Sequence, residues 1–209
     1  GVRVPAEHFM ASDTSGGVLE RPAQRFTSGE QVRWEVPVVS WCASTAAAPG
    51  AGLALLLDGP QGVDADQERL GVSLLRGPTW PDPNADRGWH RHRLALMPVS
   101  DGWCRAGVPQ AALAFREPGW CRPAVLQARR QLMPPLPLGL VPVAMAAPDP
   151  ALEDEAGKGL GLRLLNPGAR RQIWRPQGWS LRQSGGALVD AITFKPGELA
   201  EVALVPDDG

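Results

Sequence analysis

One stretch of the sequence gathers most of the side chains that could take part in acid–base or binding chemistry. It runs from Leu74 to His92 as LLRGPTWPDPNADRGWHRH and holds aspartates, arginines, tryptophans and histidines between two apolar runs. Its carboxylates Asp82 and Asp86 stand close together, and glycosidases act through two carboxylates. This stretch is therefore the first candidate for a site.

The same spacing also has a purely structural interpretation. Asp82 and Asp86 flank the sequence PNA, which suits an Asx-type loop whose carboxylates accept hydrogen bonds from backbone N–H groups. Arg76 and Arg87 could clamp these carboxylates in bidentate ion pairs. Alternatively, the stiff loop reaches a sugar site, with Arg87 and Trp80 facing the ligand. From the residues alone we favour the structural interpretation, because ion pairs are commoner in loops than binding sites are.

Other carboxylates lie upstream, at Asp58, Asp64 and Asp66. The last two belong to DGPQGVDADQE, a segment so rich in turn-forming residues that we predict a loop. Side chains of this type cap their own backbone in turns. We therefore interpret Asp64 and Asp66 as turn formers and not as members of a catalytic pair.

His90 and His92 stand two positions apart, which places both imidazoles on one face of an expected strand. Zinc needs a third and usually a fourth ligand, and the remaining histidine, His8, is far away in sequence. Arg91 and Arg93 also make a bound dication unfavourable here. We predict no metal site in this chain and interpret both histidines as partly exposed.

No nucleophile with a neighbouring base is visible. Ser40, Cys42 and Ser44 flank Trp41, but no histidine is near in sequence to serve as the base that a triad needs. Cys42, Cys104 and Cys121 show no metal-type spacing. An odd cysteine count indicates reduced, buried thiols and hence a cytoplasmic protein.

Composition excludes several classes of function. The net charge is −1, so nothing draws nucleic acid or an anionic membrane surface to the chain. Neither a phosphate-binding loop nor a dinucleotide motif is present, and no apolar run approaches the roughly 20 residues that span a bilayer. The start, GVRVPAEHF, lacks the order of a signal peptide, and its leading glycine leads us to expect a chain cut from something longer.

Glycine and proline, at 24 and 22 residues, are too frequent for long helices. The segment QVRWEVPVVSW alternates, which predicts a strand with Val32, Trp34 and Val36 on one face. The run GLALLLDG predicts a strand buried on both faces. Further strands are predicted in RLGVSLLR, HRHRLALMPV, LGLVPVAMAA, LGLRLLN, RRQIWR, ALVDAITF and LAEVALVP. Strands at such short spacing predict an all-β, antiparallel β-sandwich.

One segment departs from this pattern. In AGVPQAALAFREP, Val108, Ala112 and Phe115 stand three or four positions apart, which predicts one short helix with an apolar face. Pro118 ends it. We place the main part of the sandwich at residues 1–132. Residues 133–209 are expected to supply a proline-rich crossing and the closing strands of the same sandwich, or a small β subdomain.

Several segments occur in a familiar order: GVLERPAQRFTSGEQVRWEVPVVSWCAS, the run from GLALLLDG to RLALMP, and DGWCRAGVPQAALAFREP. Together they resemble the C-terminal domain of glycoside hydrolase family 38 α-mannosidases. The most specific signal is the proline–aspartate stretch, which resembles the family pattern S-L-L-R-x-P-x-x-P-D-P-x-A-D-x-G-x-H. GLRLLNPG and ALVDAITFKPGELAEVALVP resemble the closing region, so the resemblance spans nearly the whole chain.

The resemblance implies a galactose-mutarotase-like supersandwich that lies beside a catalytic barrel. In the family, α-mannosidic bonds are hydrolysed with retention, and the nucleophile, the acid and the zinc ligands lie on that barrel. None of the barrel is in this chain. We therefore expect no catalytic residue and no cofactor here, zinc in the absent domain, and no activity of the chain alone.

The resemblance also suggests which residues meet substrate. Arg87 is the first candidate to reach the sugar site, Arg76 the second, and Asp86 the third. The expected partners are the N-terminal catalytic barrel of the same polypeptide and mannose-containing glycans. Two alternatives remain open: a stand-alone carbohydrate-binding module that uses Trp80, Trp89 or Trp103, and a structural or interaction module.

Overall fold

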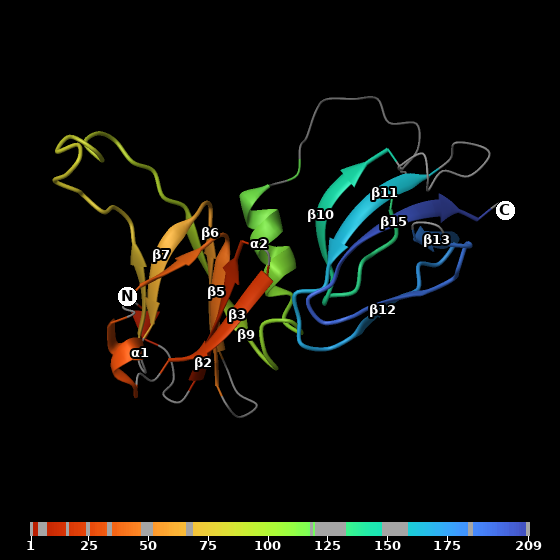
Figure 1. Ribbon diagram of the computed structural model, residues 1–209, viewed down its shortest axis with the longest axis horizontal. Coiled ribbons are helices and arrows are strands. Elements are labelled where there is room, and N and C mark those ends of the chain that lie inside the picture. The colour runs from red at the N-terminus through yellow and green to blue at the C-terminus, as the bar shows by residue number, and fades with distance from the viewer. Residues whose placement is uncertain are drawn as a thin grey trace. The chain divides into compact units, whose positions relative to one another are not determined.

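The computed structural model describes residues 2–3, 8–15, 17–23, 26–32, 35–46, 52–65, 69–117, 119, 133–147, 159–183 and 186–207. The chain divides into two compact units, Gly1–Gly119 and Trp120–Gly209 (Figure 1). The predicted boundary between residues 132 and 133 stays a prediction, because residues 120–132 lie outside the described part. Each unit has a hydrophobic core of its own.

The first unit contains a five-stranded antiparallel sheet in the order β3-β2-β5-β6-β9. Strand β6, which lies between β5 and β9, is the apolar run GLALLL, in which Ala54 and Leu56 face one side and Leu55 and Leu57 the other, all buried. The prediction of a strand buried on both faces is thus confirmed. The strands are β2 (His8–Thr14), β3 (Gly17–Pro22), β5 (Trp41–Ala46), β6 (Gly52–Leu57) and β9 (Leu94–Val99).

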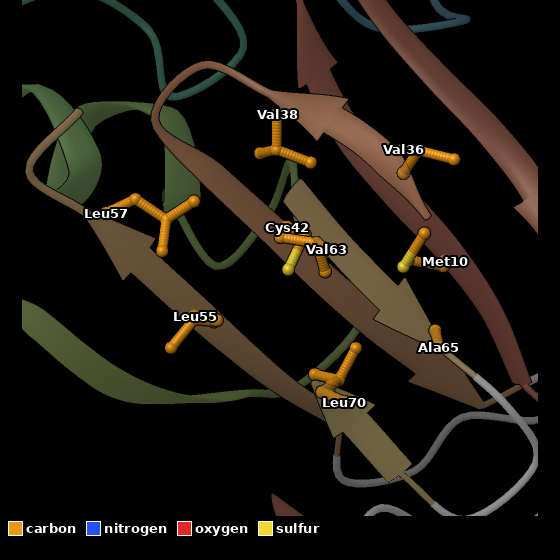
Figure 2. Close-up of a cluster of buried hydrophobic side chains, with 9 residues drawn as sticks. All are labelled: Met10, Val36, Val38, Cys42, Leu55, Leu57, Val63, Ala65 and Leu70. Atoms are coloured by element: carbon orange, nitrogen blue, oxygen red, sulfur yellow. The ribbon is translucent and has the colours of Figure 1, made fainter. Parts of the chain in front are cut away.

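A four-stranded antiparallel sheet in the order β1-β8-β7-β4 covers one face of this sheet. Its strands are β1 (Val2–Arg3), β4 (Val36–Val38), β7 (Gln61–Ala65) and β8 (Arg69–Ser73). Figure 2 shows the side chains between the two sheets: Met10, Val36, Val38, Cys42, Leu55, Leu57, Val63, Ala65 and Leu70. Because both sheets bury one face in this shared core, the unit is an antiparallel β-sandwich, as predicted.

A helix, α2 (Val108–Arg116), covers the other face of the five-stranded sheet. Val108 and Ala112 are fully buried against that sheet, with Phe115 partly buried one turn later. The predicted helix and its apolar face are confirmed. The helix starts after Gly107, whose φ of 70° is a left-handed conformation that favours glycine. It ends just ahead of Pro118, which disfavours helical geometry in the residue before it.

A second, shorter helix corrects the predicted strand in QVRWEVPVVSW. Helix α1 (Ser28–Val32) takes the first part of that segment, and β4 begins only at Val36. A reciprocal capping box starts the helix: the Glu30 N–H donates to Thr27 Oγ1 at 3.2 Å, and Glu30 Oε2 accepts from the Thr27 N–H at 2.9 Å. Local capping outweighs the alternating pattern here, so Val32 ends up exposed on the helix and not in a strand.

Replacing Thr27 with alanine is expected to lower the free energy of unfolding by about 1 kcal/mol, because the side-chain acceptor for the Glu30 N–H is lost. Denaturant unfolding of the chain measures this. Ser28→Ala is the matched control: Ser28 is exposed in the first turn, and alanine favours helix. Equal stability of the two variants would show that the cap does not stabilise α1.

The predicted loop DGPQGVDADQE also proved wrong in part, because strand β7 occupies its centre. Val63 and Ala65 are buried in the sandwich core. Asp64 lies between them and pairs with Arg69 on the neighbouring strand, with Oδ2 and Nη2 2.7 Å apart. Asp64 is thus a cross-strand partner and not a turn former, since burial of its two neighbours outweighs the turn propensity of the segment. Asp66 lies outside the described residues.

The second unit contains a four-stranded antiparallel sheet, in the order β10-β11-β15-β13, and a two-stranded sheet of β12 and β14. The bounds are β10 (Val141–Ala146), β11 (Leu160–Leu165), β12 (Gln172–Trp174), β13 (Trp179–Gln183), β14 (Ile192–Phe194) and β15 (Leu199–Pro206). The two sheets share one core: Leu140, Leu162, Leu164, Trp174, Leu181, Ile192, Phe194, Val202 and Leu204. Every strand predicted here is present, while β13 was not predicted.

The described residues thus form an all-β structure with two short helices, one more than predicted. The sandwich architecture of the sequence analysis is confirmed by the paired sheets of the first unit. Neither α1 nor α2 has the length and apolar character that a bilayer crossing would need.

Candidate functional site

The candidate stretch forms a long exposed connection between β8 and β9. We call residues 74–93 the arm. They contain no helix or strand, and in Figure 1 the yellow and yellow-green chain of the arm extends away from the strands of the first unit. Connections of this length without secondary structure are uncommon in compact domains and are usually functional.

The carboxylate of Asp86 holds the two ends of the arm's tip together. Its Oδ2 accepts hydrogen bonds from the backbone N–H of Gly77 at 2.9 Å and of Arg76 at 3.3 Å. Asp86 itself has a φ of 63°, a left-handed conformation that aspartate and asparagine tolerate better than most residues. Its backbone carbonyl lies 2.9 Å from His90 Nε2. One residue thus connects both sides of the arm.

Asp82 organises a smaller turn within the arm. Its Oδ1 accepts from the Asn84 N–H at 2.8 Å, and its carbonyl accepts from the Ala85 N–H at 3.2 Å. The predicted Asx-type loop is therefore confirmed. The predicted Arg–Asp clamps are wrong: within the described part of the chain, neither Arg76 nor Arg87 makes an ion pair with these carboxylates. Backbone amides satisfy the carboxylates and leave both guanidinium groups exposed.

Arg93 anchors the base of the arm, a role that was not predicted from the sequence. Its Nη1 lies 3.6 Å from Asp58 Oδ2, at the end of β6, and its Nη2 donates to the Phe115 carbonyl at 3.0 Å. The guanidinium also lies 5.0 Å from the centroid of the Phe115 ring. The sequence indicated one part of this anchor, because the sequence analysis placed Phe115 on the buried face of the predicted helix.

The exposed surface of the arm carries two indoles and two guanidinium groups that make no ion pair with the described residues. Trp80 is 84% exposed and Trp89 fully so. Tryptophan and arginine are the residues most enriched among those that dominate binding energy at interfaces. Both indoles are open to solvent, so their flat apolar faces are accessible to a partner. The arm therefore has the composition of a binding element, while Asp86 positions it.

The two histidines lie at the end of the arm, ahead of β9 and not within it. Their rings are nearly parallel, with centroids 6.2 Å apart, and His92 Nδ1 is 3.4 Å from Gln61 Nε2. Nowhere in the described residues do three His, Cys, Asp or Glu side chains come together in a metal-binding group.

The serine considered as a nucleophile has a carboxylate partner. Ser40 is buried and its Oγ donates to Asp13 Oδ2. Cys42 lies in the sandwich core, where burial raises its thiol pKa to about 12, so the thiolate that a nucleophile requires is disfavoured. Trp103 is likewise buried and donates to Glu20 Oε1 at 2.6 Å, so it offers no face to a sugar.

Burial raises the pKa of Asp13 above 3.8, against the lowering effects of the Ser40 hydrogen bond and Arg116. The stability that this group contributes is present below pH 3.8 and is lost as pH rises through the folded-state pKa. Asp13→Asn keeps an acceptor for Ser40 without the charge. We therefore expect the variant to be more stable than the parent near neutral pH, and this gain to shrink in acid. Thermal unfolding over a pH series measures it, and a gain that is unchanged in acid would contradict this account.

Comparison with known proteins shows what part of the first unit is similar to. Residues 3–84 match the family model described as the glycosyl hydrolases family 38 C-terminal domain. This range covers the sandwich core and the first half of the arm, including Asp82. Residues 3–84 are thus similar to the C-terminal domain of this family.

Individual relatives are also similar to part of the chain. The chain is 40% identical over 102 residues to alpha-mannosidase 2C1 of Homo sapiens and 37% identical over 102 residues to alpha-mannosidase 2C1 of Mus musculus. It is 35% identical over 82 residues to alpha-mannosidase G of Dictyostelium discoideum. These alignments cover 49%, 49% and 39% of this chain, but only 10%, 10% and 7% of the relatives. The chain therefore spans a small part of the length of the relatives it matches.

Proposed function

We propose that this chain is the C-terminal β-sandwich portion of a retaining α-mannosidase. The single observation that carries the proposal is the family 38 C-terminal domain match over residues 3–84, with relatives named as α-mannosidases. In this role the sandwich supports a catalytic barrel in the same polypeptide, and the chain alone is inactive. The arm is the part of the chain best suited to reach the barrel or the sugar bound there.

Within this proposal, the arm's residues have different roles. Arg87 and Arg76 have exposed guanidinium groups with no ion pair in the described part of the chain, so they can donate hydrogen bonds to sugar hydroxyl groups. The carboxylate of Asp86 already accepts two backbone hydrogen bonds. Asp86 therefore acts on the sugar site through the position of Arg76 and Gly77.

We assign zinc to the absent barrel. The described residues do not bring three suitable ligands together, so they do not fit a catalytic zinc ion, and no step of the reaction is placed on this chain. We further propose a cytoplasmic protein. The free, buried thiol of Cys42 supports this, since exported proteins tend to oxidise their cysteines.

The test compares the purified chain with the complete polypeptide, using an aryl α-mannoside as substrate. We expect hydrolysis by the complete polypeptide only. The anomeric configuration of the first product, followed by NMR, tests retention. Hydrolysis by the chain alone would overturn the proposed division of roles, and a complete polypeptide without α-mannosidase activity would overturn the assignment.

The exposed Trp80 and Trp89 favour a second candidate, a module that binds glycans by itself through the arm. Titration calorimetry of the isolated chain with mannobiose separates the two. Heat that disappears in a Trp80→Ala, Trp89→Ala double variant would favour independent binding. Absence of that heat, with activity in the complete polypeptide, favours a supporting role.

A further inference from the structure

The second unit contains an open cleft of about 510 Å³ that lies outside the family match. Its lining residues are Pro134, Pro135, Arg175, Pro176, Gln177 and Trp179. Sites for small molecules are typically clefts of about 300–1,000 Å³, lined by apolar groups with a few polar ones. This cleft has that size, but its accessible lining is more polar than that of such sites, with Arg175 and Gln177 beside the prolines and the indole of Trp179.

The walls of the cleft are fixed by the core beneath them. Trp174 is buried, and its Nε1 donates to the Pro135 carbonyl at 3.1 Å, which holds the proline segment against β12. Pro134 and Pro176 are buried. Trp179 opens β13 and packs partly against the same core, which leaves part of its indole accessible. The apolar surface is therefore preformed, which lowers the entropic cost of binding.

The polar groups of the cleft are accessible. Arg175 and Gln177 are exposed, two positions apart, in the connection between β12 and β13. Arg175 makes no ion pair with any described residue. A guanidinium offers five N–H donors, and an amide both donates and accepts. Together they match a ligand whose edge carries several hydroxyl groups.

We propose that this cleft binds a hexopyranose ring of an oligosaccharide. One C–H face of the sugar lies against the indole of Trp179, whose π face is electron-rich, and the hydroxyl groups bond to Arg175 and Gln177. A proline-rich peptide fits less well, because such peptides dock in grooves lined by several aromatic side chains. Here there is one indole, and the prolines belong to the protein.

The experiment uses the whole 209-residue chain, labelled with nitrogen-15. Methyl α-mannopyranoside, mannobiose and glucuronate are titrated separately, and the indole N–H signals are followed by NMR. We expect the Trp179 signal to shift with a Kd of about 1 mM, while the signal of the buried Trp103 stays unchanged. A response to glucuronate alone would identify an acidic pyranose as the ligand and still support the proposal.

Matched variants locate the binding. Arg175→Ala and Gln177→Ala are expected to raise Kd by about threefold to tenfold each, the loss of one hydrogen bond. Arg171→Ala, an exposed arginine that does not line the cleft, should leave Kd within about twofold. Trp179→Phe should keep binding that Trp179→Leu loses. If Trp179→Leu does not fold, Arg175→Ala and Gln177→Ala still test the proposal.

Three outcomes would overturn the proposal. They are no shift of the Trp179 signal at about 20 mM of any of these sugars, a shift caused only by a proline-rich decapeptide, or equal effects of Arg171→Ala and Arg175→Ala. The proposal does not depend on the α-mannosidase assignment. Binding by the isolated chain tests the cleft, whereas hydrolysis by the complete polypeptide tests the assignment.

Discussion

Trp174→Ala is expected to lower the free energy of unfolding of the second unit by about 4 kcal/mol. Trp174 is one of the largest fully enclosed side chains, at 2% exposure, and it joins the two-stranded sheet to the core of the four-stranded sheet. Its removal leaves a cavity and also breaks the hydrogen bond from Nε1 to the Pro135 carbonyl. Denaturant unfolding, with hydrogen exchange at β11 and β15 to localise the effect, measures the loss.

Two further variants separate the contributions. Trp174→Phe keeps most of the packing and loses the hydrogen bond, so we expect a smaller loss of about 1–2 kcal/mol. Trp89→Ala is the matched control, because Trp89 is fully exposed and its removal should change stability by less than about 0.5 kcal/mol. A loss at Trp174 no larger than that at Trp89 would show that Trp174 does not organise this core.

Asp86→Ala in the complete polypeptide is expected to reduce kcat/KM by about 100-fold, as a small displacement of a positioned group can. The variant removes the acceptor for the N–H groups of Arg76 and Gly77. It also places alanine at a φ of 63°, which disfavours the native geometry of the arm. Kinetics on an aryl α-mannoside measure the effect, which rests on the proposed role of the arm.

Asp86→Asn separates positioning from charge, because asparagine keeps an acceptor and tolerates the left-handed conformation. We expect it to recover most of the activity. Asp101→Ala is the matched control: Asp101 is exposed, has a φ of 56° and lies outside the arm. In the isolated chain, Asp86→Ala should also speed hydrogen exchange at Gly77. Faster exchange with unchanged activity would show that the arm does not contribute to catalysis.

Much of the strand content was predictable because burial patterns repeat over short windows. The short run GLALLL favours a strand covered on both sides, and α2 follows from apolar residues spaced for one helical face. The errors at Val32 and Asp64 have different causes. A local capping box between Thr27 and Glu30 forms α1, whereas burial against a second sheet forms β7.

The arm also combines features that could be predicted from the sequence with features that could not. Its aspartates were predicted to bind backbone N–H groups, because Asx-type turns depend on neighbours only a few positions away. The partners of Asp86 at Arg76 and Gly77 are 10 and 9 positions away, and the Arg–Asp clamps predicted from composition are absent from the described residues. Composition indicates which groups are available, but it does not determine which of them meet.

The amino-acid sequence by itself determined the all-β class, the helix α2, the turn chemistry of the arm and the resemblance to family 38, because each depends on short-range pattern. Only the tertiary structure decided that Trp103 is buried while Trp80 and Trp89 are exposed, and that Arg93 joins the arm to Asp58 and Phe115. It also brought Pro134 and Pro135 to Trp179, forming the cleft of the second unit. The physical reason is that burial and long-range contacts are set by the packing of sheets distant in sequence, which no local pattern encodes.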